Sequence, residues 1–165
     1  MKQIRKNLFE TNSSSCHTVS IESNGSHLEE SKFKVNDDNY IEVPLNEFGW
    51  SLNKYDDQEN KLAYLILIIA YTNGFGDCFL SHSDDIDKWK NKLYKCDDFE
   101  ELNSDIAYYT NTNGINIINI DGGYIDHQSV ERFSSLSDFL YYYGINSTID
   151  FIFDSNISII TNNDN

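Results

Sequence analysis

The longest apolar run of the chain lies near its middle and predicts a buried helix over residues 61–71. Apolar residues recur there at helical spacing, and two more widen the stripe until it covers nearly the whole helix surface: Leu62, Leu65, Ile66 and Ile69, then Leu67 and Ile68. Asn73-Gly74 ends the helix, and the acidic residues of 56–59 lie at its start, where the helix dipole favours them. A helix that is apolar nearly all round belongs inside the core.

Three further segments fit helices: residues 84–95, 99–109 and 136–143, the last of them ending at Gly144. The first ends in a lysine cluster, which either complements the helix dipole on a solvated face or forms a small basic patch: Lys88, Lys90, Lys92 and Lys95. Residues 149–153 fit either a helical turn or a strand.

Short alternating stretches predict strands at residues 3–9, 17–22, 40–43, 114–120 and 157–160. The fourth is apolar on both faces, which is typical of a central strand. The polar residues that follow the last strand are expected to form a tail. Together these segments predict the α+β class, with a single domain over the whole chain in which a mixed or antiparallel sheet packs on the buried helix.

The composition is that of a folded domain with an acidic surface. Of 165 residues, 39% are hydrophobic and 14% aromatic, and the net charge is −15. This charge disfavours binding to nucleic acid and to anionic membranes, because both are themselves negative. No apolar run is long enough to span a bilayer and no signal peptide is visible. Cys16, Cys78 and Cys96 match neither a disulfide framework nor a metal ribbon, so we expect a cytoplasmic protein.

The acidic residues concentrate in the C-terminal part of the chain. Residues 96–165 hold 12 acidic residues and one basic residue, Arg132. Such asymmetry indicates either a surface for a basic partner or a solvated face that keeps the protein soluble. The densest acidic group is predicted to bind the partner: Asp97, Asp98, Glu100 and Glu101.

A dense run of hydroxyl, thiol and imidazole groups near the N-terminus is the first candidate for chemistry. Ser15, Cys16 and His17 close this run, and a serine or cysteine becomes a nucleophile when a base lies near it. Asp126 and His127 form a second candidate. If the two stretches meet across the sheet, they assemble a nucleophile, a base and an orienting carboxylate. The alternative is structural: a tight turn whose hydroxyls bind its own backbone, and two loops held together by polar contacts.

No cofactor or metal site is predicted. The chain lacks a phosphate-binding glycine loop and a dinucleotide fingerprint. A metal set drawn from dispersed residues has no recognised zinc or calcium spacing: His17, His82, Asp84, Asp126 and His127.

The N-terminal string Phe9-Glu10-Thr11-Asn12-Ser13-Ser14-Ser15, followed by one variable position and His17, resembles the start of a group of small bacteriophage and prophage proteins. The stretch Asp126-His127-Gln128-Ser129 and residues 159–165 are similar to the same group, whereas residues 26–112 carry no recognised motif. The resemblance implies a phage origin and no particular reaction. It also implies that the two polar stretches belong to one shared feature.

Three functions are therefore expected. The first is a phage-encoded, non-enzymatic acidic protein that binds and modulates a basic host protein, such as an anti-phage defence protein, by mimicking nucleic acid. The second is a small hydrolase or transferase that uses Ser15 or Cys16 with His17, Asp126 or His127. The third is a virion or assembly component, which an exposed apolar patch and self-association would indicate.

Overall fold

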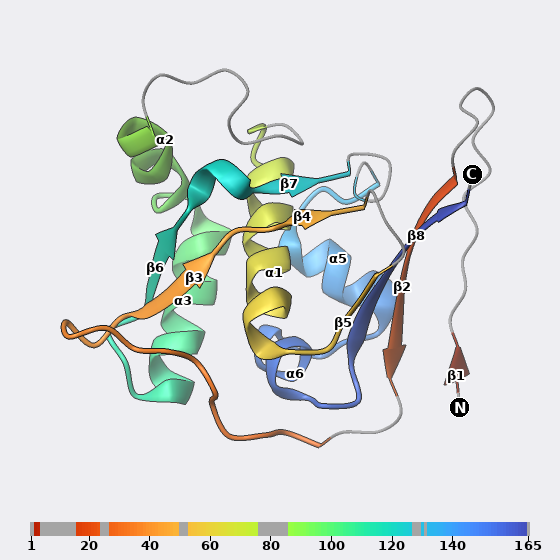
Figure 1. Ribbon diagram of the computed structural model, residues 1–165, viewed down its shortest axis with the longest axis horizontal. Coiled ribbons are helices and arrows are strands. Elements are labelled where there is room, and N and C mark those ends of the chain that lie inside the picture. Colours follow the sequence, from red (N-terminus) through yellow and green to blue (C-terminus); the bar gives the residue numbers. More distant parts are fainter. Residues whose placement is uncertain are drawn as a thin grey trace.

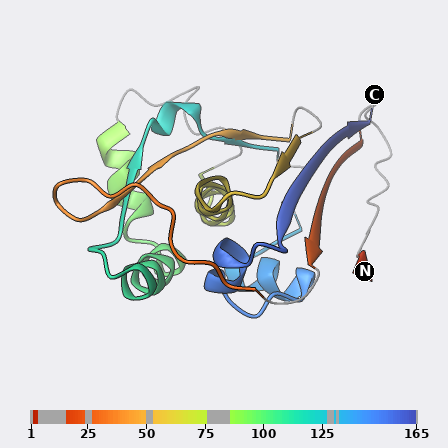
Figure 2. The same ribbon diagram turned by 60° about the horizontal axis from the view of Figure 1, so that its bottom comes forward.

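One helix, α1 (Gln58–Thr72), lies at the centre of the structure with the other elements arranged around it (Figure 1). Figure 2 looks along α1 and shows strands on one side of it and helices on another. The computed structural model describes residues 2–3, 16–23, 27–49, 53–75, 86–126, 130 and 132–164. Of these, residues 2–3, 16–23, 86, 121 and 162–164 are described by their backbone alone.

Side chains at its two ends set the bounds of α1. The carboxylate of Asp57 accepts a hydrogen bond from Asn60 N (2.8 Å), which is an N-cap. At the other end, the amide of Asn73 donates to Ile69 O. Between them, residues 62–70 are each at most 1% exposed. The apolar run therefore predicts both the helix and its burial correctly.

Two parallel strand pairs run along one side of α1. Strand β3 (Ile41–Pro44) pairs with β6 (Ile115–Ile118), and β4 (Glu47–Phe48) pairs with β7 (Tyr124–Ile125). Because β4 follows β3, and β7 follows β6 after the 3-10 turn at 120–122, the two pairs continue one another along α1 (Figure 1).

The expectation that residues 114–120 form a central strand is wrong. In the described part of the chain, β6 has β3 as its one strand neighbour. Two side chains from the segment around α2 close its outer edge instead. Ile117 N donates to Tyr94 Oη (3.0 Å), and Lys90 Nζ donates to Ile117 O (2.7 Å). Lys90 is therefore part of the fold rather than of a solvated basic face.

An antiparallel sheet of four strands, in the order β1-β2-β8-β5, brings the first and last segments of the chain together. Its strands are β1 (Lys2–Gln3), β2 (Cys16–Ser23), β5 (Asn53–Tyr55) and β8 (Ser158–Asp164). The prediction that the polar residues after 160 form a tail is wrong as far as Asp164, because β8 continues to that residue and pairs it with Cys16. Ladder hydrogen bonds use backbone groups, so a polar segment pairs as well as an apolar one when a partner strand lies beside it.

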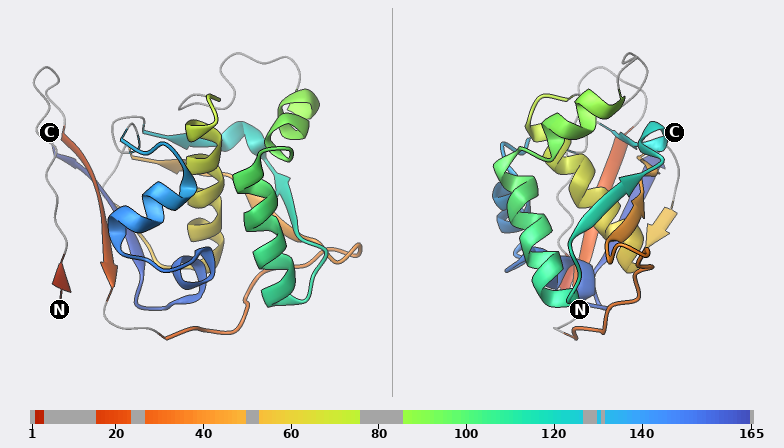
Figure 3. Two further views of the ribbon diagram at one scale, coloured as in Figure 1. Left: turned by 180° about the vertical axis from the view of Figure 1, so that it is seen from behind. Right: turned by 90° about the vertical axis from the view of Figure 1, so that its left-hand side faces the viewer.

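Helices α3 (Asp97–Thr110), α5 (Leu136–Tyr143) and α6 (Thr148–Phe153) cover other sides of α1, and Figure 3 shows α3 and α5 from behind with α6 between them. Helix α2 (Ile86–Leu93) lies at the outer edge of β6 (Figure 1). The predicted bounds of α5 are confirmed, including its end at Gly144, which adopts a left-handed φ of 68°. Residues 149–153 take the helical alternative. The α+β class with a buried helix is confirmed.

Replacing Ile66, which is fully buried in the middle of α1, tests the dominance of this helix in the core. We expect Ile66→Ala to lower the free energy of unfolding by about 2–5 kcal/mol, because the smaller side chain buries less apolar surface and leaves a cavity that its tightly packed neighbours fill only in part. Urea denaturation measures the change. The matched control is Tyr108→Ala, whose side chain is 92% exposed and which should change stability by less than about 0.5 kcal/mol. Similar losses in both variants would contradict the central role of α1.

Buried tyrosines make the core sensitive to alkali. Burial raises the pKa of Tyr64 well above its ordinary value and that of Tyr143 to about 12. The folded state therefore holds these protons at a pH where the unfolded chain has released them. Stability falls as the pH rises from 10.0 to about 12.

We expect Tyr143→Phe to lose about 2 kcal/mol less stability than the wild type between pH 10.0 and about 12. The phenyl ring keeps the packing and has no hydroxyl to ionise. Urea unfolding at both pH values, with tyrosinate absorbance as a second readout, measures the difference. Equal losses of stability in the two proteins over this pH range would show that the pKa of Tyr143 is not raised.

Candidate functional site

The structure places the predicted nucleophile and its predicted partners on separate elements. Cys16 and His17 open β2, where they lie opposite Asp164 and Asn163 of β8. Asp126 directly follows β7, is 3% exposed, and donates its backbone N–H to Phe48 O (3.0 Å). Ser15 and His127 lie outside the described residues. The meeting of the two stretches therefore stays a prediction.

Asp126 sits against Gly49, and the close approach of the two backbones requires glycine there. Gly49 has a φ of +121°, and a Cβ built on it would lie 2.4 Å from the Cβ of Asp126. Such a contact has no room for any side chain. The position of Asp126 is thus set by the β4–β7 pairing on one side and by Gly49 on the other.

The acidic residues predicted to bind a partner lie on α3 but do not form one patch. Asp98 Oδ2 accepts a hydrogen bond from Leu136 N (3.2 Å) and so joins α3 to the start of α5. Glu100 and Glu101 point to different pockets on the two sides of α3. Because successive helical residues are about 100° apart, four neighbouring acids are distributed around the helix. Asp97 is exposed and lines neither pocket.

A groove of about 420 Å³ runs between α3 and α5 and is closed at one end by the start of α6. We call it the α3–α5 groove; its main lining residues are Glu101, Asp105, Leu140, Tyr141, Asn146 and Thr148. Asp105 Oδ2 accepts from Thr148 Oγ1 (2.8 Å), which holds this carboxylate at the groove. Tyr141 is 86% exposed beside it.

Glu101, Asp105 and Tyr108 recur at positions i, i+4 and i+7, so they share one face of α3. Within the described residues, the one ion pair joins Lys32 to Glu29, so neither Glu101 nor Asp105 has a basic partner there. Glu101 is among the residues predicted from the sequence, whereas Asp105, Tyr108 and Tyr141 are not. The i, i+7 spacing from Glu101 to Tyr108 indicates a shared exposed face only once the buried face of α3 is known, and Tyr141 lies on α5, where that spacing gives no signal.

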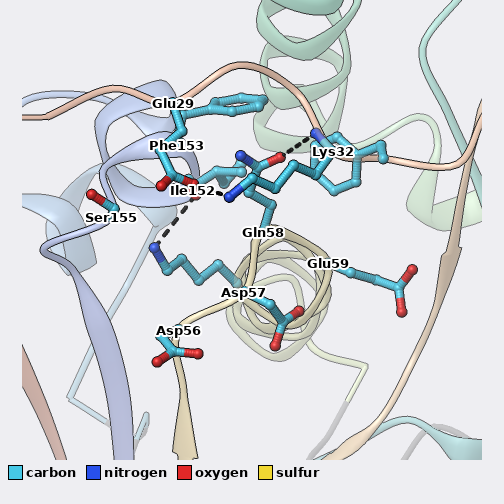
Figure 4. A pocket seen from close by; sticks show the side chains of 11 residues that line it. Glu29, Lys32, Asp56, Asp57, Gln58, Glu59, Ile152, Phe153 and Ser155 are labelled. Atoms are coloured by element: carbon cyan, nitrogen blue, oxygen red, sulfur yellow. Dashed lines mark hydrogen bonds and ion pairs between the residues drawn. The ribbon is translucent and has the colours of Figure 1, made fainter.

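A second hollow, of about 390 Å³, lies at the start of α1. Figure 4 shows Asp56, Asp57 and Glu59 around it, with the Gln58 side chain reaching towards Lys32. The Gln58 amide accepts from Lys32 N (2.8 Å) and donates to Glu30 O (2.9 Å), so it holds the segment before β3 onto α1.

Lys61 is 1% exposed and closes the floor of this hollow. Its Nζ donates to Asp154 O (2.8 Å) and to Ile152 O (3.5 Å), which are carbonyls at the end of α6. Burial lowers the pKa of Lys61, and the nearby Asp154 and Asp56 partly oppose this effect. Gln58 and Lys61 thus hold α1, α6 and the segment before β3 together at this hollow.

Comparison of the chain with protein-family models, with curated proteins and with solved structures gives no match. In the part of the chain that the structure describes, no helix has the length and hydropathy needed to cross a bilayer. The same residues contain no group of three histidine, cysteine or acidic side chains that could hold a metal ion. Of the five residues considered for a metal, Asp126 alone has a described side chain.

Replacing Lys61 by methionine separates its hydrogen bonds from its packing. The variant keeps the apolar stem but leaves Ile152 O and Asp154 O without their buried donor, so we expect a loss of about 1–3 kcal/mol at neutral pH. The lowered pKa of Lys61 means that the unfolded chain binds this proton more tightly. The wild type should therefore gain stability over Lys61→Met as the pH rises towards 10.5, the ordinary pKa of lysine.

The measurement is urea unfolding of both proteins across this pH range, read as the difference between them so that the tyrosine contribution cancels. A pH-independent difference would contradict the lowered pKa of Lys61.

Proposed function

We propose that the protein is an acidic interaction protein that binds a basic segment of another protein in the α3–α5 groove. The observation that carries the proposal is that Glu101 and Asp105, which have no basic partner among the described residues, line one groove together with the exposed ring of Tyr141. Two carboxylates and an exposed aromatic ring lie in the same groove, and this combination indicates a binding site more strongly than either feature alone.

The electrostatics favour a basic occupant. Glu101 and Asp105 lie one helical turn apart, and the groove lining contains no lysine or arginine. An arginine or lysine placed between two carboxylates gains attraction from both, and the gain is larger in a groove than on an open surface. The net charge of −15 adds long-range steering, which accelerates encounter with a positive partner and weakens as salt is added.

The exposed ring of Tyr141 supplies contact area in the groove. Tyrosine is enriched at protein interfaces because it buries a large ring at small cost in side-chain entropy and keeps a hydroxyl for water or the partner. A guanidinium group stacks on the ring face while its N–H groups reach a carboxylate. Tyr141 beside Glu101 offers both elements to an arginine.

The wider setting is part of the proposal. The resemblance of the N-terminal string to phage and prophage proteins supports a phage origin, and hence action in the host cytoplasm. A host protein that normally binds nucleic acid carries a basic surface of the required kind, and the carboxylates of the groove would stand in for phosphates. A defence protein of that type is the partner class that we favour, with modulation of its activity as the outcome.

An arginine-rich synthetic peptide tests the groove directly. We expect Glu101→Lys and Tyr141→Ala each to weaken its binding about tenfold, since each removes an interaction of about 1–2 kcal/mol. Fluorescence anisotropy at low salt measures the dissociation constants. The matched control is Glu47→Lys on β4, which makes the same charge change on the strand side of α1 and should alter binding less than about threefold.

Two results would contradict the proposal. One is equal weakening by Glu101→Lys and Glu47→Lys, which would show that overall charge and not the groove attracts the peptide. The other is binding of a glutamate-rich peptide as tight as that of the arginine-rich one.

A further inference from the structure

Two asparagine-containing turns meet beside α3, on the side away from the α3–α5 groove. One lies at residues 36–39 before β3, and the other at residues 111–114 before β6 (Figure 1). Asn113 N donates to Asn39 O (2.7 Å), and Asn113 Nδ2 donates to Asp38 O (2.9 Å). These hydrogen bonds lock the turns together, so the surface between them is pre-formed.

The backbone of this corner is held in conformations that side chains rarely adopt. Asn39 (φ 61°), Asn111 (φ 55°) and Gly114 (φ 115°) all have left-handed φ values. Only glycine fits at position 114, because a Cβ there would lie 2.4 Å from Asn103 Oδ1. Asparagine and glycine adopt left-handed φ values at turns and helix C-caps, and Asn111 is the C-cap of α3, so these values define the conformation of the two turns.

The corner encloses a pocket of about 500 Å³, within the range of about 300–1,000 Å³ that is usual for small-molecule sites. We call it the asparagine pocket; the lining residues that matter here are Asn103, Asn116, Asp38, Glu100, Tyr40 and Tyr94. Tyr94 stacks on Phe99 with ring centroids 4.8 Å apart and anchors its hydroxyl on Ile117 N. The aromatic wall is therefore rigid.

Two amides in the pocket are oriented by the fold and keep hydrogen-bond capacity. Asn103 Oδ1 accepts from Ile115 N (2.7 Å), and Asn116 Oδ1 accepts from Lys90 Nζ (3.0 Å). Each amide oxygen is thus engaged, which fixes the amide and leaves its Nδ2 donors without a protein acceptor in the described part of the chain. The carboxylates of Asp38 and Glu100 likewise accept no hydrogen bond from the residues that the structure describes.

This set of groups selects a neutral ligand rich in hydroxyls. The lining holds two carboxylates and no lysine, arginine or histidine, and the neighbouring Lys90 is engaged by Asn116 Oδ1 and Ile117 O, so the two carboxylates disfavour phosphates and other anions. The amide N–H donors have nothing to offer a cation. A sugar hydroxyl, in contrast, donates to a carboxylate and accepts from an amide at the same time, and the C–H face of the ring packs on a tyrosine.

We infer that the asparagine pocket binds a neutral sugar ring through neighbouring hydroxyl groups, which donate to Glu100 and Asp38 and accept from Asn103 and Asn116. The ring face packs against Tyr40 at the rim. The same chemistry occurs in a free saccharide and in the ribose of a nucleoside. This site is independent of the α3–α5 groove, because it lies on the opposite side of α3 and uses other residues.

The test is isothermal titration calorimetry with a defined panel: glucose, galactose, maltose, adenosine, 2′-deoxyadenosine and adenosine monophosphate. We expect at least one neutral member with neighbouring hydroxyls to bind. Binding of a saccharide alone identifies a free sugar as the ligand class. Binding of adenosine together with loss of binding for 2′-deoxyadenosine identifies a ribose. Either outcome supports the pocket.

The variant Glu100→Gln keeps the size of the side chain and removes the charged acceptor, so binding should weaken about tenfold. The control Asp87→Asn makes the same charge change on α2 outside the pocket and should leave binding unchanged. Thermal unfolding of both variants checks that the fold is retained. Because Glu100 is exposed and its carboxylate accepts no hydrogen bond from the residues that the structure describes, Glu100→Gln should fold normally.

Three results would overturn the inference. The first is the absence of binding by every neutral member of the panel at millimolar concentration. The second is binding that survives Glu100→Gln or falls equally with Asp87→Asn. The third is tighter binding of adenosine monophosphate than of adenosine, since a phosphate should be repelled by Asp38 and Glu100. None of these results bears on the peptide experiment at the α3–α5 groove.

Discussion

Burial of α1 on every side is the constraint on which the rest of the structure depends. A helix with one apolar stripe can lie on the surface of a sheet, but α1 is buried from residue 62 to residue 70 around its whole circumference. Strands and helices must therefore surround it, and no single sheet can do so. The strands accordingly divide into two parallel pairs, which continue one another along one side of α1, and a separate antiparallel sheet, while helices cover other sides of α1.

Enclosing α1 with short elements leaves many strand edges and helix ends that need hydrogen-bond partners, and polar side chains supply several of them. Lys61 donates to carbonyls at the end of α6, Lys90 and Tyr94 close the outer edge of β6, and the Gln58 amide binds the segment before β3. Each substitutes for backbone pairing that a longer sheet or helix would provide. The lysines are thus part of the architecture, which leaves the surface still more acidic than the composition suggests.

Helix α3 separates two surfaces of different chemistry. Its Phe99, Leu102 and Ile106 face the core, and this orientation places Glu101 and Asp105 in the α3–α5 groove while Glu100 and Asn103 face the asparagine pocket. The acidic cluster seen in the sequence is therefore divided between two sites. One presents carboxylates with the exposed Tyr141, which suits a basic protein segment. The other combines carboxylates with oriented amides, which suits neutral hydroxyls.

The sequence by itself determined the elements whose signals are local. The apolar run at 61–71, the capped segment ending at Gly144 and the alternation after Cys16 each depend on residues close together in the chain, and all three are confirmed. The tertiary structure decided what depends on distant partners. Pairing with β2 turned the polar residues before Asp164 into strand, and Lys90 and Tyr94 replaced a second neighbour of β6. Both pockets beside α3 also belong to this class, because their walls come from segments up to 80 residues apart, and no local pattern records which segments will meet.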